Sequence, residues 1–189
     1  YVVGEDKRQR MYRFVRKLVG QGRQAYLVCP AVEESEDGVL RSAEAWAQTL
    51  QQSVFPDLRV GLLHGKMKSA EKDAALAAFS AGETDILVAT TVVEVGVDVP
   101  NATLMVIENA ERFGLSQLHQ LRGRVGRGGA QSYCVLVSGT RQEETKKRLE
   151  ALCRTTDGFQ IAEQDLALRG PGDFFGSRQH GLPLLKVAS

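Results

Sequence analysis

Short apolar segments recur along most of this 189-residue chain, and longer amphipathic segments separate them. Each apolar segment is four or five residues long and rich in aliphatic residues. Because they are continuous rather than alternating, they are typical of strands in a parallel sheet that is covered on both faces. The predicted strands are residues 25–29, 60–63, 86–89, 104–107 and 133–137.

The amphipathic segments between these strands predict helices. Two of them place apolar residues at i, i+3, i+4 and i+7, and a third is expected to begin at an N-cap, Ser69, and to stop at Gly82. Alternating strands and helices with right-handed crossovers predict an α/β fold with a doubly wound, mainly parallel sheet and helices on both faces. The two apolar stripes are Met11, Phe14, Val15 and Leu18, and Ala43, Trp46, Ala47 and Leu50.

The character of the chain changes after about residue 140. A charged helical pattern covers residues 142–154, and a short helical pattern and a Gly/Pro-rich tail follow it. We therefore expect an α/β domain at residues 1–140 and a helical appendage at residues 141–189. The chain lacks an initiator Met and begins within a pattern, so we also expect it to be a piece of a longer protein.

Composition narrows the possible classes of protein. With 43% hydrophobic and 25% charged residues, the chain can bury a substantial core, and its net charge of +1 gives no overall attraction to nucleic acid. Three cysteines without a CxxC spacing predict reduced thiols in a cytoplasmic protein, with no zinc site or disulfide. No apolar run approaches the roughly 20 residues that a membrane span needs.

Residues 117–127 combine arginines and glycines in one short segment. If a helix runs from Ser116 as its cap to a stop at Gly128 and Gly129, then Gln120, Arg124 and Arg127 share one face. Arginine's fixed, charged fork can meet phosphate oxygens with two hydrogen bonds and can stabilise charge during phosphoryl transfer. The alternative is a solvated basic helix with surface salt bridges.

Two glycines, Gly123 and Gly126, lie inside that predicted helix. Each costs about 1 kcal/mol relative to Ala in a helix. We therefore expect a compensating use for them, such as the close approach of another backbone or of a ligand.

Polar residues follow the predicted strand at residues 86–89. Thr90 and Thr91 stand at an expected helix start, where hydroxyls and free N–H groups can bind phosphate. Asp98, beside Gly96, can accept a hydrogen bond from a ribose hydroxyl or orient an arginine. The alternative for Asp98 is an ordinary turn carboxylate.

Another polar segment, His64 and Gly65 followed by Lys66, comes after the strand at residues 60–63. A loop histidine and lysine at the carboxyl end of a strand can touch a nucleic-acid backbone. The alternative is a structural histidine.

The chain has no phosphate-binding loop. Residues 61–67 have one residue too few between their glycines and lack the Ser or Thr that must follow the Lys. No Asp-Glu pair follows a strand to hold magnesium, and no metal site is predicted. A chain with candidate arginine fingers and no phosphate loop cannot complete an ATP site by itself.

Residues 90–100 resemble motif V, and residues 120–127 resemble motif VI, of superfamily-two helicases; together they match the second RecA-like domain. Longer strings are similar to the RecG family of bacterial branched-DNA translocases, so the resemblance covers essentially the whole chain. These strings are residues 24–30, 33–36, 108–114 and 165–179.

The resemblance implies that Arg124 and Arg127 reach the phosphates of ATP bound by the first RecA-like domain of the same polypeptide. That domain would also hold most of the contacts to ATP and Mg²⁺. Gln120 would help to organise the cleft between the domains, and Gly96 and Asp98 would lie beside the nucleotide.

The resemblance also implies contacts with forked or branched DNA, and remodelling of forks and junctions in repair and recombination by a monomeric bacterial protein. His64, Gly65, Thr90 and Thr91 would contact the DNA backbone. Residues 141–189 would form the helical hairpin and loop called the translocation motif. The candidates for coupling are Arg169, Arg178 and Gln179.

Three alternatives stay open. The coupling candidates can instead form a polar loop that caps the domain. The transcription-repair coupling factor has similar motifs and a similar appendage. A non-catalytic α/β module that binds nucleic acid is the third alternative.

Overall fold

The computed structural model describes residues 1–30, 36–90, 98–156, 158 and 163, with the backbone alone at residues 36–41. Its strands are β1 (Val2–Val3), β2 (Gln24–Val28), β3 (Val60–Leu63), β4 (Ile86–Ala89), β5 (Ala102–Ile107) and β6 (Tyr133–Val137). Its α-helices are α1 (Arg8–Gly20), α2 (Glu36–Thr49), α3 (Ser69–Ser80), α4 (Leu115–Arg122) and α5 (Glu143–Arg154). Shorter turns are η1 (Glu5–Lys7), η2 (Leu50–Val54) and η3 (Ala110–Arg112).

A six-stranded sheet forms the centre of the molecule, in the order β1-β6-β5-β2-β4-β3. Its paired strands are all parallel in the described part of the chain. The central strand β2 places Tyr26 opposite Met105 of β5 on one side and Leu87 of β4 on the other. All five predicted strands are confirmed, and β1 is an additional short strand that pairs with β6.

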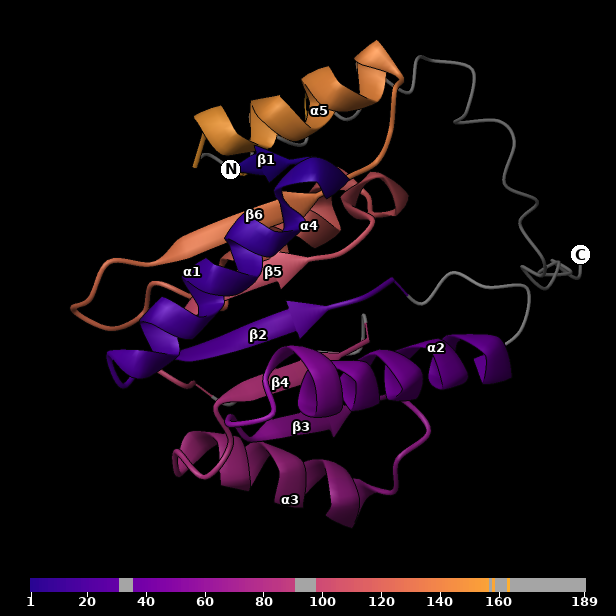
Figure 1. Ribbon diagram of the computed structural model, residues 1–189. Coiled ribbons are helices and arrows are strands. Elements are labelled where there is room, and N and C mark those ends of the chain that lie inside the picture. Colours follow the sequence, from indigo (N-terminus) through magenta and orange to yellow (C-terminus); the bar gives the residue numbers. More distant parts are fainter. Residues whose placement is uncertain (31–35, 91–97, 157, 159–162, 164–189) are drawn as a thin grey trace, which may run out of the picture.

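Helices cover both faces of this sheet, as predicted (Figure 1). Helices α1 and α2 pack on one face, where Val15, Leu18 and Leu50 are buried against the strands. Helices α3, α4 and α5 pack on the other face. The apolar side chains at this second face include Phe79, Leu118 and Leu149, all completely buried. Continuous apolar strands are therefore matched by an apolar layer on each side.

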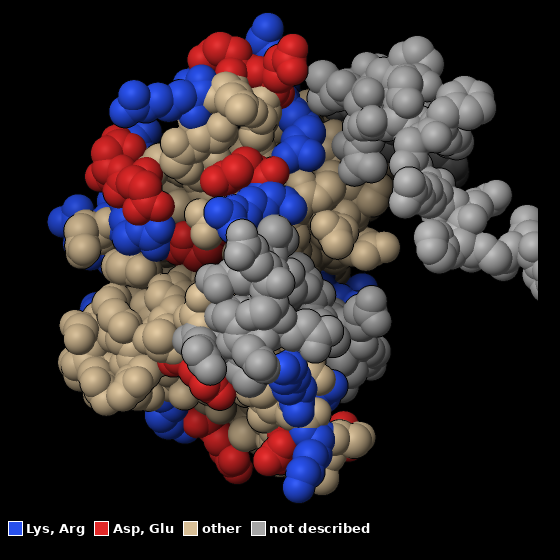
Figure 2. All heavy atoms as spheres, turned by 90° about the vertical axis from the view of Figure 1, so that its right-hand side faces the viewer, with Lys and Arg blue, Asp and Glu red and all other residues tan. Residues whose placement is uncertain are grey.

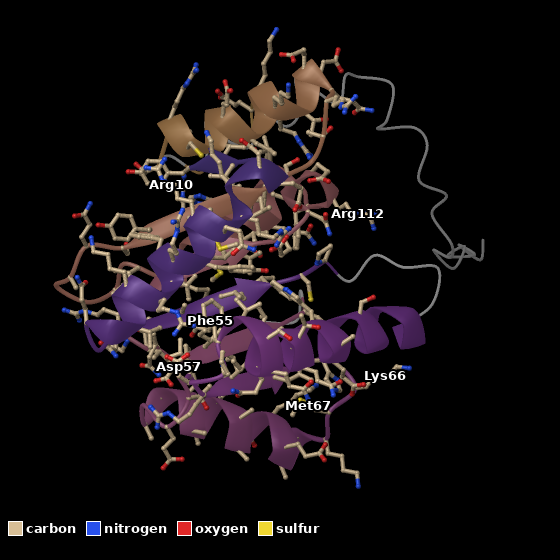
Figure 3. All side chains as sticks on the ribbon, in the orientation of Figure 1. Arg10, Phe55, Asp57, Lys66, Met67 and Arg112 are labelled. Carbon is tan, nitrogen blue, oxygen red and sulfur yellow. The ribbon has the colours of Figure 1, made fainter. Side chains whose placement is uncertain are left out.

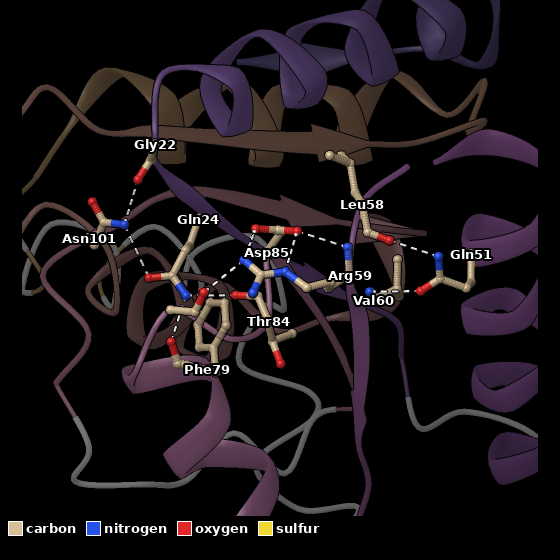
Figure 4. Close-up of polar contacts among 11 residues, drawn as sticks. Gly22, Gln24, Gln51, Leu58, Arg59, Val60, Phe79, Thr84, Asp85 and Asn101 are labelled. Atoms are coloured by element: carbon tan, nitrogen blue, oxygen red, sulfur yellow. Dashed lines mark hydrogen bonds and ion pairs between the residues drawn. The ribbon is translucent and has the colours of Figure 1, made fainter. Parts of the chain in front are cut away.

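The amino edge of the sheet, where the strands begin, is closed by a polar network around Gln24 (Figure 4). The Gln24 side-chain amide donates to the carbonyls of Phe79, at 2.6 Å, and Thr84, at 2.8 Å. Its oxygen accepts from the Asn101 amide at 3.2 Å. Gln24 is only 4% exposed, so these bonds satisfy a polar side chain that has little access to water.

An ion pair between Arg59 and Asp85 closes the same edge (Figure 4). The Arg59 guanidinium donates to both carboxylate oxygens of Asp85, at 3.1 and 2.8 Å, and to the Gly82 carbonyl at 2.8 Å. The Arg59 backbone N–H also donates to Asp85, at 2.8 Å. These hydrogen bonds hold the pKa of Asp85 below its usual range.

Helix α3 begins one residue earlier than predicted. Lys68, not Ser69, is the N-cap, and its backbone N–H donates to the Glu71 carboxylate at 2.8 Å. Glu71 thus binds one of the N–H groups that a helix start leaves without an internal partner. The predicted stop is confirmed, because Gly82 follows the helix with a φ of 76°, which favours glycine.

Helix α4 is much shorter than predicted, so one predicted arrangement is wrong. It begins after Gly114, whose backbone N–H donates to the Gln117 side chain at 3.1 Å, and it ends at Arg122. Gly123 caps it, and Gly126 has a φ of 85°. These glycines favour a loop over a helix. Gln120, Arg124 and Arg127 therefore do not share the face of one helix.

Helix α5 confirms the predicted charged helix, with Gln142 as its N-cap. Leu149 and Leu152 are buried in the same core as the sheet. The rest of the predicted hairpin lies outside the described residues, and the boundary near residue 140 stays a prediction.

Two further sequence expectations concern membrane-spanning helices and the state of the cysteines. None of the helices within the described segments is long and apolar enough to cross a membrane. Cys29, Cys134 and Cys153 are free thiols. Burial raises the pKa of both Cys29 and Cys134 to about 11.

Candidate functional site

The candidate residues lie at two edges of the sheet: Asp98 and Arg127 near the amino edge, and His64, Gly65 and Thr90 at the carboxyl edge, where the strands end. In parallel α/β sheets the carboxyl edge is where ligands bind. Figure 2 looks onto this edge and shows acidic as well as basic side chains around the segments drawn in grey. In Figure 3, Lys66, after β3, and Arg112, in η3, both lie at this side of the molecule.

Arg127 and Asp98 meet near the amino edge, in the segments that lead into β6 and β5, although 29 residues separate them. Arg127 Nη1 donates to Asp98 Oδ1 at 2.9 Å, and Arg127 Nε donates to the Gly123 carbonyl at 2.9 Å. The side chains of Arg127 and Asp98 are 49% and 57% exposed. The structure therefore places Asp98 where it can orient an arginine, and both groups stay accessible to a ligand.

Glycines let the arginine loop, which we define as residues 123–129, approach the segment at Asp98. Gly126 has a left-handed φ, and a Cβ there would lie 2.7 Å from Ser132 Oγ. A Cβ at Gly128 would lie only 2.8 Å from the Pro100 carbonyl oxygen. A close backbone approach was predicted for Gly123 or Gly126, but it occurs at Gly128, which was not predicted.

Arg124 and Gln120 lie close to this pair in sequence, but in different surroundings. Arg124 is half-buried, whereas Gln120 is exposed on α4. Burial raises the pKa of Tyr26, in β2; the nearby Arg124 opposes that rise, Asp98 adds to it, and Arg127 also opposes it. These three charged residues therefore all lie within electrostatic reach of Tyr26.

His64 lies in the loop after β3 and is largely buried. Its Nε2 is 3.9 Å from the Glu44 carboxylate, and its Nδ1 is buried without a hydrogen-bond partner among the described residues. Its backbone carbonyl accepts from Met67 N at 3.3 Å, which forms the turn, and Gly65 is exposed. The loop exposes backbone at Gly65, and a role in DNA binding stays a prediction.

Thr90 ends β4 and is only 3% exposed. Its backbone N–H donates to the Leu63 carbonyl at 3.2 Å, which ties the ends of β3 and β4 together. Thr91 and Gly96, with the helix start predicted there, lie outside the described residues. The coupling candidates Arg169, Arg178 and Gln179 also lie outside them.

A buried ion pair at the carboxyl edge was not predicted. Arg8, at the start of α1, donates to both oxygens of Glu108, at the end of β5, at 2.5 and 2.9 Å. Arg8 also binds the Glu5 carboxylate, and the pKa of Arg8 is raised by Glu5 and by Glu108. Glu108 is 6% exposed. A carboxylate directly after an apolar strand is the sequence signal for such a pair.

This ion pair borders a cavity of about 420 Å³ between α1, α2 and the ends of β2 and β5. Trp46 and Arg112 also line it, together with Asn109. Asn109 has a φ of 47°, in the left-handed region. The cavity lies at the carboxyl edge, but Arg8 is already committed to two carboxylates.

Two arginines that attach α5 were also missed. Arg122, at the end of α4, donates to the carbonyls of Leu152 and Thr155. Arg148, in α5, donates to the Glu111 carbonyl at 2.8 Å. Arg122 stands within the arginine-rich string, but its partner carbonyls are 30 and 33 residues away, so local spacing does not reveal them.

Within the described residues, no group of three or more His, Cys, Asp and Glu side chains could hold a metal ion. The exposed Arg127 guanidinium, by contrast, suits phosphate oxygens. A doubly wound parallel sheet with an arginine loop between α4 and β6 defines the class, a RecA-like domain of superfamily-two helicases.

Comparison with known proteins gives the particular group. The model of the helicase conserved C-terminal domain matches residues 6–129, and that of ATP-dependent DNA helicase RecG, domain 3, C-terminal, matches residues 155–189. The chain is 56% identical over 188 residues to the ATP-dependent DNA helicase RecG of Synechocystis sp.. This alignment covers 100% of this chain and 23% of that protein. It is 53% identical to RecG of Bacillus subtilis, across 100% of this chain and 28% of that protein.

Solved structures agree with this assignment. A structure of RecG bound to a three-way DNA junction has 49% identity and a TM-score of 0.77, over 92% of this chain and 22% of that one. Domain 2 of the DEAD-box helicase Mss116p, bound to an RNA duplex, has 18% identity and a TM-score of 0.63, over 88% of this chain and 67% of that one, which shows the fold alone. The chain belongs to the helicase conserved C-terminal domain family and is similar to a part of the RecG proteins. It spans about a quarter of the length of these curated relatives.

Proposed function

We propose that this chain is the C-terminal motor half of an ATP-dependent helicase that acts on branched DNA. The observation that carries the proposal is the accessible contact between Arg127, in the loop before β6, and Asp98, in the segment before β5. The names of the relatives support DNA as the nucleic acid and ATP as the substrate.

In the proposed reaction, Arg127 and Arg124 donate hydrogen bonds to the phosphates of ATP that the first RecA-like domain of the same polypeptide holds. Asp98 keeps Arg127 oriented until the two domains close, and Gly96 and Gln120 complete this side of the cleft. The fixed guanidinium forks then stabilise the negative charge that develops on the transferred phosphoryl group.

The partner domain is also where we place the Mg²⁺ that accompanies ATP. This chain offers neither a phosphate-binding loop nor an Asp-Glu pair after a strand. Its residues can therefore bind ATP only as one side of a site that the partner domain completes.

We further propose that His64, Gly65, Thr90 and Thr91 contact the DNA backbone. Gly65 is exposed and offers its main chain, whereas the buried Thr90 needs a local rearrangement before its hydroxyl can reach DNA. Forked or branched duplex DNA is the proposed substrate, because one similar structure is RecG bound to a three-way junction.

Residues 1–140 are the proposed second RecA-like domain, and residues 141–189 the proposed translocation motif. Arg169, Arg178 and Gln179 are the proposed coupling residues of that motif. The match of residues 155–189 to a segment of RecG supports this division. We place the intact protein in the bacterial cytoplasm, as a monomer that associates with the nucleoid when it is bound to DNA.

The test is Arg127→Ala in the intact protein, with Arg59→Ala as the matched control. Both variants remove an arginine paired with an aspartate, but Arg59 directly precedes the outer strand β3, whereas Arg127 lies in the loop before β6. We expect DNA-stimulated ATP hydrolysis to fall by about 10³-fold or more for Arg127→Ala and to persist for Arg59→Ala. Survival of more than about a tenth of the wild-type rate in Arg127→Ala would remove Arg127 from this role.

A second measurement concerns residues 1–189 alone. We expect no ATP hydrolysis above the level of an Arg127→Ala preparation, with or without forked DNA, and recovery when the first RecA-like domain is supplied. Turnover that depends on Arg127 in the chain alone would instead indicate a complete ATP site. DNA binding that never affects the ATPase rate of the partner domain would favour a non-catalytic binding module.

A further inference from the structure

The end of helix α5 is capped by a side chain from another helix. Arg122, the last residue of α4, donates through Nη1 to the carbonyls of Leu152 and, at 2.8 Å, Thr155. The last carbonyls of a helix lack partners within the helix, and a cation at that end is also favoured by the helix dipole. One guanidinium therefore fixes both the final turn of α5 and the residue that follows it.

Arg122 is itself held by its neighbour in α4. Its Nη2 lies 3.0 Å from His119 Nδ1. Because arginine can only donate, Nδ1 must accept, which leaves the proton of a neutral His119 on Nε2. A Cβ at Gly158 would lie 3.0 Å from that Nε2. Two adjacent side chains of α4 thus contact the chain where it leaves α5.

The body of α5 is attached separately. Leu149 and Leu152 are 0% and 1% exposed, and Arg148 Nη2 donates to the Glu111 carbonyl at 2.8 Å. These contacts anchor the helix on the sheet and on η3, away from the arginine loop. Arg122 differs because it reaches the C-terminal end of α5 from the residue that immediately precedes that loop.

A short path connects this cap to the candidate ATP cleft. Gly123, which follows Arg122, accepts a hydrogen bond from Arg127 Nε at 2.9 Å, and Arg127 Nη1 binds Asp98 at 2.9 Å. Helix α4 ends at Arg122, so the Arg122–Gly123 peptide joins a rigid helix to a glycine-rich loop. Movement of Arg127 toward phosphate oxygens would change its bond to Gly123 and so act on the residue beside Arg122.

We propose that Arg122 is a positioning residue that couples the arginine loop to the C-terminal end of α5 and to the residues beyond Thr155. In this proposal, closure of the cleft around ATP reaches the appendage through the Arg122 cap, while Arg122 itself contacts neither ATP nor DNA. The inference rests on the proposed motor function and names the side chain that transmits the motion.

The test compares Arg122→Gln and Arg122→Lys in the intact protein. Gln removes the fork and its charge, and Lys keeps the charge but cannot bridge two carbonyls with a planar fork. The matched control is Arg154→Gln, which removes a cation from the last turn of the same helix, where Arg154 is 80% exposed and pairs with Glu150. The readouts are DNA-stimulated ATP hydrolysis, strand displacement on forked DNA and melting temperature.

We expect Arg122→Gln to keep ATP hydrolysis within a factor of about three while strand displacement per ATP falls by about tenfold. Arg122→Lys should show a smaller loss of displacement, and Arg154→Gln should match the wild type in both activities. Equal losses of hydrolysis and displacement would place Arg122 in the ATP site and overturn the proposal. Unchanged displacement would show that the cap only stabilises the fold.

Hydrogen exchange on the wild type tests the coupling between the arginine loop and α5 even if both Arg122 variants fail to fold. With forked DNA and a non-hydrolysable ATP analogue, we expect protection to change together in peptides covering residues 119–127 and 149–156. A change confined to residues 119–127 would overturn the coupling. Failure of the motor proposal would look different, because the wild type itself would then hydrolyse no ATP on DNA.

Discussion

The Arg59–Asp85 pair beside β3 and the Arg127–Asp98 pair in the segments before β6 and β5 join the same residue types with very different numbers of hydrogen bonds. The Arg59 guanidinium meets both oxygens of Asp85 and the Gly82 carbonyl, and its backbone N–H adds another bond to Asp85. The Asp85 side chain is 18% exposed. In the second pair, a single bond joins Arg127 to Asp98, whose side chain is 57% exposed.

This difference separates polar groups that hold the fold together from groups that are free to exchange partners. Gln24 and Asp85 each have several partners, so exchanging one of them for a ligand would leave buried groups unsatisfied. Arg127, by contrast, can leave the exposed Asp98 oxygen for another oxygen at little cost. We therefore expect substitutions at Gln24 and Asp85 to act on stability and those at the Arg127–Asp98 pair to act on activity.

The largest expected effect comes from the two aspartates. Asp98→Ala in the intact protein should lower DNA-stimulated ATP hydrolysis by about 100-fold, because Arg127 loses the partner that orients it. Asp85→Ala should leave the rate per folded molecule unchanged. Steady-state ATPase rates of both variants test this contrast, and a loss in Asp85→Ala as large as that in Asp98→Ala would break it.

A pair of glutamines tests the same division by stability. Gln24→Leu should lower the free energy of unfolding by about 2–4 kcal/mol, because it leaves the carbonyls of Phe79 and Thr84 without their donors. Gln120→Leu, at an exposed position of α4, should change it by less than about 0.5 kcal/mol. Denaturant unfolding of residues 1–189 measures both, and equal values would contradict the division.

The smallest expected effect is a pH dependence at the amino edge. The pKa of Asp85 is lowered by its bonds to Arg59, so this carboxylate stabilises the fold above the unfolded-state pKa of about 3.9 and loses that contribution as pH falls through the lower folded-state pKa. Wild type should exceed Asp85→Asn by about 1 kcal/mol at pH 7, and the gap should shrink below about pH 4. Unfolding curves at several pH values measure it, and a gap that widens in acid would show the opposite linkage.

Much of the fold could be predicted because local patterns decide it. The five longer strands follow continuous apolar runs, and Gly82 ends α3 where predicted. Strand β1 was missed because it has two residues, and its place depends on pairing with β6 far along the chain. Helix α4 was predicted too long because the apolar spacing continues to Val125, whereas the glycines turn the backbone away after Arg122.

The candidate site was predicted less completely, for a physical reason. The sequence pointed to Arg127 and Asp98, and the structure brings them together. The sequence did not identify Arg8 as the partner of Glu108, 100 residues away, or Arg122 as the cap of α5. Such contacts depend on which elements become neighbours in three dimensions, so residue spacing within one segment cannot predict them.

The close approach of Gly128 to Pro100 has a consequence for anyone who recombines or redesigns this chain. A side chain at Gly128 would collide with the Pro100 carbonyl, which cannot move aside as a flexible side chain can. Residues 98–100 and 123–129 therefore have to be exchanged together when segments of this chain are recombined. Transplanting either segment alone from a distant relative requires a glycine at position 128, and a library that varies this position has to vary its facing turn in the same molecule.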